Sequence, residues 1–269
     1  MQAMETSRPV PYPAEPLSFA AGVVKEHLPR HLRREILKQG LRGSRFFSKG
    51  SAVECPACGA TASRYVRGRC LTCSADSRQR LLALFLRREG HIDADSIVRI
   101  LHFAPEPSLI RMFSEDPTVD YVPGDLVPDK GHEKVDATAI HLDPTFDGIV
   151  SSHVLEHIPD DLSAITEMYR VLKPAGWAVV MVPVVDTLAE TYESDAVQSR
   201  WARHRHFGQH DHVRVYGRDL PNRLEAAGFL VTVRQYADEF PVSDFRRFGL
   251  RSSDVIFYCQ KPADSQSPG

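Results

Sequence analysis

The chain has 269 residues, of which 42% are hydrophobic and 25% charged, a composition that excludes a mostly disordered or collagen-like protein. No run of about 18 apolar residues occurs, which argues against a membrane-spanning helix. The first residues lack a basic segment followed by an apolar one, so we expect no secretory signal and a soluble protein of the cytoplasm.

Charge is spread unevenly along the chain. The formal net charge is −2, but residues 25–90 hold 15 Lys and Arg against 5 Asp and Glu, a local balance of +10. This window is expected either to face something anionic, such as nucleic acid, a membrane surface or a charged substrate, or to be a solvated arm that balances an acidic body. Both interpretations stay open on the sequence.

The N-terminal third is predicted to precede the main domain. Residues 1–18 are Pro-rich and expected to be disordered, and residues 19–50 form a basic segment with apolar residues at helical spacing. Residues 51–90 combine a cysteine block with a helix that ends at Gly90 and has Ser74 or Ser77 as its N-cap.

Four of the five cysteines form two C-x-x-C pairs, Cys55 with Cys58 and Cys70 with Cys73. Two such pairs can place four thiolates at the corners of a tetrahedron, the geometry and ligand type that Zn²⁺ prefers. We therefore predict a structural zinc with no open coordination position. Gly59 and Gly68 allow tight turns beside the sulfurs. The fifth cysteine, Cys259, is predicted to be a small core residue.

From residue 95 to 262, predicted strands alternate with predicted helices. The expected strands are residues 96–104, 120–125, 134–140, 147–155, 176–184, 230–236 and 254–261, and the expected helices are residues 107–116, 160–173 and 218–229. An irregular insert rich in His and Arg is expected over residues 186–217, and residues 263–269 are expected to be a loose tail. The alternation predicts an α/β fold with a mostly parallel sheet covered on both faces. The last two strands are joined without an evident helix, so the final strand is expected to run antiparallel.

The carboxyl ends of the strands supply the candidate ligand contacts, because open α/β sheets bind ligands at that edge. Asp125 follows the second strand, where its carboxylate can accept hydrogen bonds from both hydroxyls of a ribose. Asp136 is placed to accept a hydrogen bond from an adenine amino group. Ser151, Ser152 and His153 end the fourth strand.

The segment from Phe146 to Val184 resembles the fourth-strand to fifth-strand block of class I S-adenosylmethionine-dependent methyltransferases. Its text, LEHIPDDLSAITEMYRVLKPAG, carries a pattern typical of the type 11-like subgroup that acts mainly on small molecules and lipids. The resemblance spans residues 95–262. It implies a Rossmann-like doubly wound sheet, S-adenosylmethionine as cofactor and methyl transfer as the activity.

The first loop departs from the family pattern. The family has an acidic residue followed by G-x-G-x-G, whereas this chain reads HFAPEP from His102 to Pro107, with no glycine. We expect the cofactor to bind nonetheless, with Glu106 on its α-amino group, and loss of binding is the alternative. The predicted cofactor contacts are His102, Phe103, Ala104, Pro105, Glu106, Asp125, Leu126, Asp136, Ala137, Ser152 and His153.

The HVLEH text places His153, Glu156 and His157 at spacings that share one face of a helix. Because the order is not H-E-x-x-H, we predict no metal there. His153 is expected to line the pocket, Glu156 to make a polar contact at the helix end, and His157 to be structural.

In this fold the insert over residues 200–217 is expected to lie above the methyl donor and shape the acceptor pocket. His210 and His212 are the candidates for removing a proton from the acceptor, with Asp211 as orienter or as a metal ligand beside a diol. Alternatively, these residues only hydrogen-bond the loop, and an anionic substrate is held by Arg203, Arg205 and Arg214.

We therefore expect a methyltransferase acting on an oxygen or nitrogen of a small-molecule or carbohydrate-like acceptor. One alternative is an rRNA or other nucleic-acid methyltransferase that uses basic residues 25–90, although the chain has no (N/D)-P-P-(Y/F) motif. A second is a non-catalytic binding protein on the same fold. Peripheral membrane contact through the amphipathic residues 19–47 also stays open.

Overall fold

The computed structural model describes residues 49–89, 91–92 and 96–263. The expected disordered stretch 1–18, nearly all of the basic segment 19–50 with its membrane-contact hypothesis, the helix stop at Gly90 and most of the tail lie outside the described residues. Within those residues, every helix is too short or too polar to span a membrane.

The central sheet of the described structure has seven strands. Its spatial order is β10-β11-β7-β6-β3-β4-β5. The strands are β3 (Val98–Phe103), β4 (Val119–Asp125), β5 (Glu133–Lys134), β6 (Phe146–Ser152), β7 (Leu172–Met181), β10 (Leu230–Arg234) and β11 (Ile256–Gln260). Strand β11 is antiparallel to both of its neighbours, and the other pairs are parallel. The predicted α/β fold and the predicted direction of the last strand are confirmed.

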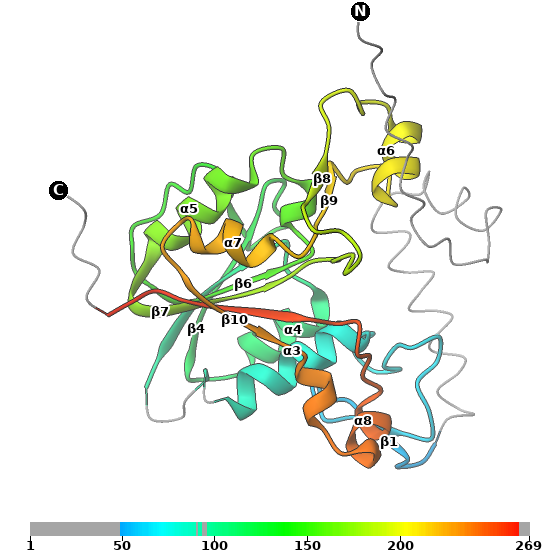
Figure 1. Cartoon of the computed structure of the whole chain (residues 1–269). Coiled ribbons are helices and arrows are strands. Elements are labelled where there is room, and N and C mark those ends of the chain that lie inside the picture. Colours follow the sequence, from blue (N-terminus) through cyan, green and yellow to red (C-terminus); the bar gives the residue numbers. More distant parts are fainter. Residues whose placement is uncertain (1–48, 90, 93–95, 264–269) are drawn as a thin grey trace, which may run out of the picture.

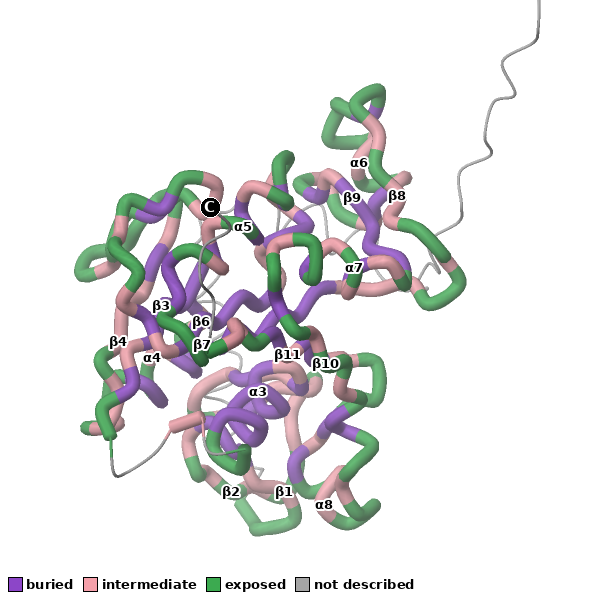
Figure 2. The backbone as a smooth tube through the Cα atoms, turned by 60° about the vertical axis from the view of Figure 1, so that its left-hand side comes forward, coloured by how far each residue is buried: buried purple, intermediate pink, exposed green. Residues whose placement is uncertain are grey.

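Helices cover both faces of the sheet because alternate strand residues point to opposite sides. Val150 and Val179 pack on the face covered by α3 (Ser77–Arg88) and α4 (Pro107–Ser114). Their neighbours Ile149 and Val180 pack under α5 (Asp161–Val171) and α7 (Leu220–Glu225). Figure 1 shows the sheet with α5 and α7 on one side and α3 and α4 on the other. Figure 2 shows the buried residues concentrated along the central strands and α3. Cys259 is fully buried in the second of these cores, as predicted.

The predicted strand over residues 134–140 is wrong beyond Lys134, because the strand that pairs with β4 is Glu133–Lys134. The carboxylate of Asp136 accepts hydrogen bonds from the backbone N and the Oγ1 of Thr138, at 2.9 and 2.8 Å. This local turn offers the backbone an alternative to the sheet ladder, and so it ends the strand.

Two connections contain more regular structure than the sequence predicts. The link between the last two strands holds a 3₁₀ turn, η2 (Tyr236–Glu239), and helix α8 (Val242–Phe248). The insert is not irregular: it contains α6 (Arg200–Phe207) and a small antiparallel sheet of β8 (Tyr192–Glu193) and β9 (Arg214–Val215). Helix α6 starts at a Ser199 cap and ends at Gly208, whose φ of 83° suits a residue without a side chain.

Helix α3 begins after Asp76, so the prediction of Ser74 or Ser77 as its N-cap is wrong. Asp76 Oδ1 accepts from the backbone N of Gln79, and Gln79 Oε1 accepts from the backbone N of Asp76, both at 3.2 Å. A carboxylate in this reciprocal capping box also meets the positive end of the helix dipole. Ser77 instead donates to Asp254 Oδ2 at 2.6 Å.

Arg80 joins the cysteine-rich segment to the C-terminal part of the domain. Its guanidinium is buried and donates four hydrogen bonds of 2.6–2.9 Å to the backbone carbonyls of Gly68, Ala75, Phe248 and Gly249. The hairpin β1 (Val53–Glu54) and β2 (Thr61–Ala62) lies beside α8. The cysteine-rich segment thus shares one hydrophobic core with the sheet. The domain boundary expected near residues 90–95 stays a prediction.

Candidate functional site

The topology places the candidate site between β3 and β6. The chain runs outward from β3 through β4 to β5, and then returns to the other side of β3 as β6. The loops that leave β3 and β6 therefore diverge at this point, as expected for the ligand-binding crevice of an open α/β sheet. Both loops begin with a strained residue: Ala104 has φ 44° and His153 has φ 56°.

Ala104 takes a left-handed conformation that usually belongs to glycine. It is exposed directly after β3, and its backbone N donates to the carbonyl of Gly124 at 2.9 Å. With only a methyl group as side chain, it leaves the backbone of the loop open to a ligand. Pro105 is buried, and Phe103 packs in the core beneath the sheet.

A chain of buried hydrogen bonds fixes the rest of the first loop. His102 lies 3.0 Å from the Tyr121 hydroxyl through Nδ1 and 2.9 Å from Glu106 Oε2 through Nε2. Arg78 lies 3.5 Å from Glu106 Oε1. Burial opposes ionisation of Glu106, but His102 and Arg78 outweigh it and keep the Glu106 pKa below its ordinary value. Glu106 Oε1 is buried beside Arg78 and accepts no hydrogen bond from the described residues.

Asp125 ends β4, and Asp136 follows β5 in a turn at the same edge of the sheet. Asp125 is the last residue of β4, half-buried, with Oδ1 accepting from Val127 N at 3.0 Å. Its carbonyl accepts from Val135 N at 3.0 Å, which brings the exposed Asp136 alongside. Leu126 is 59% exposed, and Ala137 is partly buried beside Asp136.

The end of β6 supplies two buried hydroxyls. The Oγ atoms of Ser151 and Ser152 have no hydrogen-bond partner among the described residues. His153 follows, partly exposed, and its strained backbone is held by a hydrogen bond from its N to the Met181 carbonyl at 2.7 Å. Unpaired buried hydroxyls are costly unless a ligand or water satisfies them. A polar ligand therefore fits at this edge.

A cavity of about 480 Å³ opens at the ends of β6 and β7. Its walls come from the cysteine-rich segment, the start of α3, the insert and residues 251–255, and they include His153, Met181 and Gln209. Four arginines line it: Arg67, Arg69, Arg78 and Arg251. Its two aspartates, Asp76 and Asp254, are engaged in the α3 cap and with Ser77. We call this the rim cavity; its size suits a small ligand, and its charge suits an anion.

The four predicted metal cysteines are brought together. Their sulfur atoms lie within 4.8 Å of one another, with Cys55 to Cys73 at 3.6 Å and Cys58 to Cys70 at 3.7 Å. Four sulfurs bound to one zinc at about 2.3 Å are separated by about 3.8 Å, so this cluster has the spacing of a zinc site. Hydrogen bonding by Cys55 lowers the Cys58 pKa to about 7. Gly59 and Gly68 have φ of 70° and 71°, the tight turns expected beside the sulfurs.

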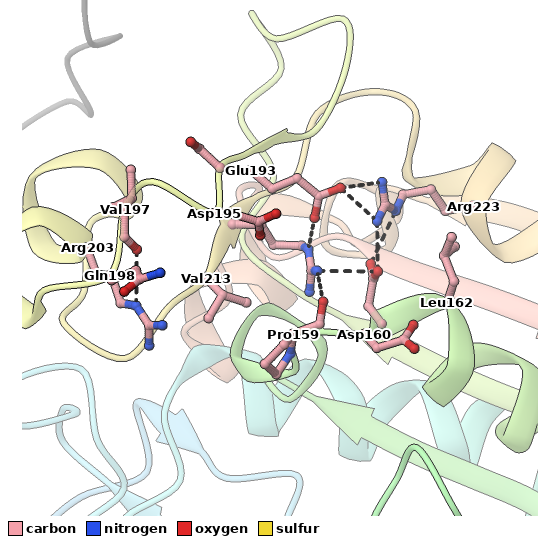
Figure 3. Close-up of a pocket in the computed structure, with 13 residues that line it drawn as sticks. Pro159, Asp160, Leu162, Glu193, Asp195, Val197, Gln198, Arg203, Val213 and Arg223 are labelled. Carbon is pink, nitrogen blue, oxygen red and sulfur yellow. Dashed lines mark hydrogen bonds and ion pairs between the residues drawn. The ribbon is translucent and has the colours of Figure 1, made fainter.

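A larger cavity, about 870 Å³, lies between the start of α5 and the insert, and Figure 3 shows its lining. None of the strand-end residues described above lines it. Its buried charges are paired: Arg214 donates to Glu193 at 2.8 Å, and Arg223 donates to Asp161 at 2.7 Å. Arg214 is 3% exposed and also donates to the carbonyls of Leu155 and Pro159. The hypothesis that Arg214 binds an anionic substrate does not fit, because this arginine anchors the insert.

The three predicted catalytic residues are consecutive in the chain but differ in exposure and in contacts. Asp211 is exposed, while His210 is partly buried next to Gln209 of the rim cavity. His212 is 4% exposed, and burial lowers its pKa. It lies against His157 and Glu156, from the 3₁₀ turn η1 (Leu155–His157). Of the HVLEH residues, only Leu155–His157 form a helical turn, so the shared helix face considered for His153, Glu156 and His157 does not form.

Sequence reasoning missed the arginines of the rim cavity as ligand contacts. Arg67, Arg69 and Arg78 belong to the basic window 25–90, so the charge count located the right segment without identifying these side chains. It also missed the approach of Glu156 to His212. These residues are distant in the chain. The available signal was the presence of histidines in two separate segments, HVLEH and the insert, which gave no indication that the two would meet.

The family described as "Methyltransferase domain" matches residues 70–233. A search of curated protein sequences found no significant match. Among solved structures, a Burkholderia thailandensis 1,6-didemethyltoxoflavin-N1-methyltransferase bound to its substrate and S-adenosylhomocysteine is 15% identical, over 97% of this chain and 98% of that one, with a TM-score of 0.49.

Two further structures are similar at a comparable level. A SAM-dependent methyltransferase from Archaeoglobus fulgidus is 15% identical over 69% of this chain and 95% of its own, with a TM-score of 0.46. Phosphoethanolamine N-methyltransferase 2 from Haemonchus contortus, in complex with S-adenosylmethionine, is 15% identical over 68% of this chain and 52% of its own, with a TM-score of 0.46. The family match spans more than half of the chain, and together with the strand order it decides the assignment. The chain belongs to the methyltransferase-domain family and is an S-adenosylmethionine-dependent methyltransferase.

Proposed function

We propose that this enzyme methylates an oxygen or nitrogen of a small-molecule or carbohydrate-like acceptor that carries a negative charge. The observation that carries the proposal is the rim cavity, where four arginines outnumber two aspartates, although Arg69 and Arg78 already contact Asp76 and Glu106. The cavity lies at the strand ends, beside the residues proposed to hold the cofactor. Guanidinium groups bind carboxylates and phosphates through paired hydrogen bonds, which favours such an acceptor.

The cofactor is proposed to lie across the ends of β3, β4 and β6. Asp125 is assigned to the ribose hydroxyls, Asp136 to the adenine amino group and Glu106 to the α-amino group. Ser152, the backbone around Ala104 and the neighbouring Leu126, Ala137 and His153 complete the contacts. His102 and Phe103 have buried side chains, so we assign them backbone contacts alone. When bound, S-adenosylmethionine supplies a methyl group already activated by its sulfonium.

The protein's part in the reaction is to orient the acceptor and to remove its proton. Of the predicted trio, His210 is proposed for the proton, because it neighbours a residue that lines the rim cavity. His212 is turned into the protein, and Asp211 contacts His157 rather than the cavity. The basic surface of Arg67 and Arg69 would orient the anionic group of the acceptor.

The four cysteines are proposed to hold a structural Zn²⁺. Their spacing and the backbone N of Thr72, which donates to Cys70 Sγ at 3.3 Å, fit a site of four thiolates. With all four positions taken by sulfur, the ion stabilises the fold and takes no part in methyl transfer. Its position fixes the loop that carries Arg67 and Arg69 into the rim cavity.

A nucleic-acid acceptor is the second candidate, because the exposed Arg64 and Arg67 continue the basic surface outside the cavity. Phosphates of RNA would bind such a surface with strong salt dependence. The two candidates differ in what lies beyond the cavity, where RNA would extend over the exposed Arg64. The same assay can separate them.

The test is transfer of a labelled methyl group from S-adenosylmethionine to three acceptor pools: phosphorylated or carboxylated sugars, the matching neutral sugars, and RNA. We expect label in the anionic sugars and little in the neutral ones. An Arg251→Ala variant should raise KM for the anionic acceptor by about tenfold or more, as for a lost charged hydrogen bond, with kcat little changed. Label that enters RNA, or neutral sugars equally well, would contradict the proposed acceptor.

A further inference from the structure

A buried carboxylate in η1 has no hydrogen-bond donor for either oxygen within the described residues. Glu156 is 1% exposed, and both of its carboxylate oxygens are buried without a hydrogen bond. His153 Nδ1 lies 3.0 Å from Oε1, and ligand atoms of His157 and His212 lie within 4.8 Å of the carboxylate. An ionised carboxylate out of contact with water costs several kcal/mol unless positive charge lies beside it, on the order of 5 kcal/mol or more. Glu156 therefore requires a cation or a proton.

The His212 imidazole near Glu156 offers the carboxylate a lone pair rather than a proton. His212 Nδ1 lies 3.2 Å from the carbonyl oxygen of Phe207. A carbonyl can only accept, so Nδ1 carries the ring proton, and the neutral ring presents an unprotonated Nε2. That Nε2 is buried and has no hydrogen-bond partner among the described residues. Two buried acceptor groups, the Glu156 carboxylate and the His212 imidazole, thus lie close together.

His157 repeats this arrangement. Its Nδ1 lies 3.3 Å from the carbonyl oxygen of Asp211 and 3.7 Å from the carboxylate of the same residue. The ring stands perpendicular to that of His212, with centroids 4.7 Å apart. One ligand atom from each of Glu156, His157 and His212 lies within 4.8 Å of the others.

Histidines that bind metals make the same contacts as His157 and His212. They donate one ring N–H to a carbonyl or carboxylate, which fixes the tautomer and aims the other nitrogen at the ion. Here His157 and His212 both donate to backbone carbonyls of the insert, next to a carboxylate without donors. The two segments that meet are the loop after β6 and the insert after β7, so the cluster also ties the insert to the rim.

We propose that Glu156, His157 and His212 bind a divalent transition metal ion, a second metal site distinct from the four cysteines. Two imidazoles and one carboxylate suit Zn²⁺, Mn²⁺, Fe²⁺ or Co²⁺ rather than Mg²⁺ or Ca²⁺, which prefer oxygen ligands. Three protein ligands leave coordination positions open. Glu156 contacts His153, which lines the rim cavity, so the ion lies one side chain away from the proposed acceptor site.

The test is titration with Co²⁺ of the full-length protein loaded with one zinc ion per chain, enough to fill the four-cysteine site alone, in the absence of cofactor and acceptor. Cobalt held by nitrogen and oxygen shows weak visible bands, whereas thiolate ligands add an intense sulfur-to-metal band in the near ultraviolet. We expect one Co²⁺ per chain with the nitrogen and oxygen signature. Glu156→Gln and His157→Gln should each weaken this binding more than about tenfold. Replacing a residue that only hydrogen-bonds a metal ligand already costs about tenfold in affinity, and these two variants remove a ligand itself.

The exposed His204 of α6 provides the matched control, and His204→Gln should bind Co²⁺ like the unmodified protein. His157 is 35% exposed, so its variant keeps the test valid if the Glu156 variant does not fold. Cobalt that enters only the thiolate site, or unchanged affinity in a folded Glu156→Gln or His157→Gln variant, overturns the proposal. Neither result bears on methyl transfer, because no methyl donor is present.

Discussion

A Cys70→Ser variant will lose its metal and much of its stability. Structural zinc sites contribute an apparent binding free energy of about 10–16 kcal/mol, as large as the whole net stability of an ordinary domain, about 5–15 kcal/mol. Cys70 also packs in the core that contains α3 and α4. Loss of the ion should therefore unfold the cysteine-rich segment and loosen the sheet face beneath it. Elemental analysis and thermal unfolding measure both effects.

Cys259→Ala is the control, because it removes a buried thiol far from the zinc ligands in the chain and leaves the four-cysteine cluster intact. It should keep full zinc content with a modest fall in Tm. The structural-zinc assignment fails if Cys70→Ser retains the metal content and Tm of the unmodified protein.

Asp161→Ala is expected to destabilise the protein by about 3–5 kcal/mol, the range for removing one partner of a buried ion pair. Asp161 is 2% exposed, accepts from Tyr216 at 2.7 Å and faces Arg223 and Arg214. Its loss would leave Arg214, 3% exposed, with only the half-exposed Glu193 as a carboxylate partner. Denaturant unfolding measures the change.

The neighbouring Asp160 separates this effect from a general cost at the start of α5. Asp160 is exposed and caps the helix through a hydrogen bond from Ser163 N at 3.0 Å. Asp160→Asn keeps a capping oxygen, so its midpoint of unfolding should stay close to that of the unmodified protein. Equal destabilisation by the two variants would show that the buried ion pairs do not hold the insert.

The α/β alternation was predictable because it depends on local patterns. Continuous apolar runs such as WAVVMV, separated by amphipathic helices, require a sheet covered on both faces. The cysteine cluster was equally accessible, since its four ligands lie within one short window. In both cases neighbouring residues in the chain carry the information.

The features that sequence reasoning missed depend on contacts between distant segments. Nothing near Arg80 in the chain indicates that its guanidinium donates hydrogen bonds to the carbonyls of Phe248 and Gly249. The meeting of Glu156 with His212 depends in the same way on how the insert folds back. Asp76 displaced the predicted serine caps because a reciprocal bond with Gln79 was available.

Titration with S-adenosylhomocysteine tests the central claim, that a loop without glycine still binds the cofactor beside Asp125. The account predicts saturable heat at one ligand per chain. Asp125→Ala should weaken binding by about 1–3 kcal/mol, through loss of hydrogen bonds to a charged group. Asp120→Ala, at the other end of the same strand, should bind normally. Absence of heat at high protein concentration, or unchanged affinity in Asp125→Ala, would contradict the account.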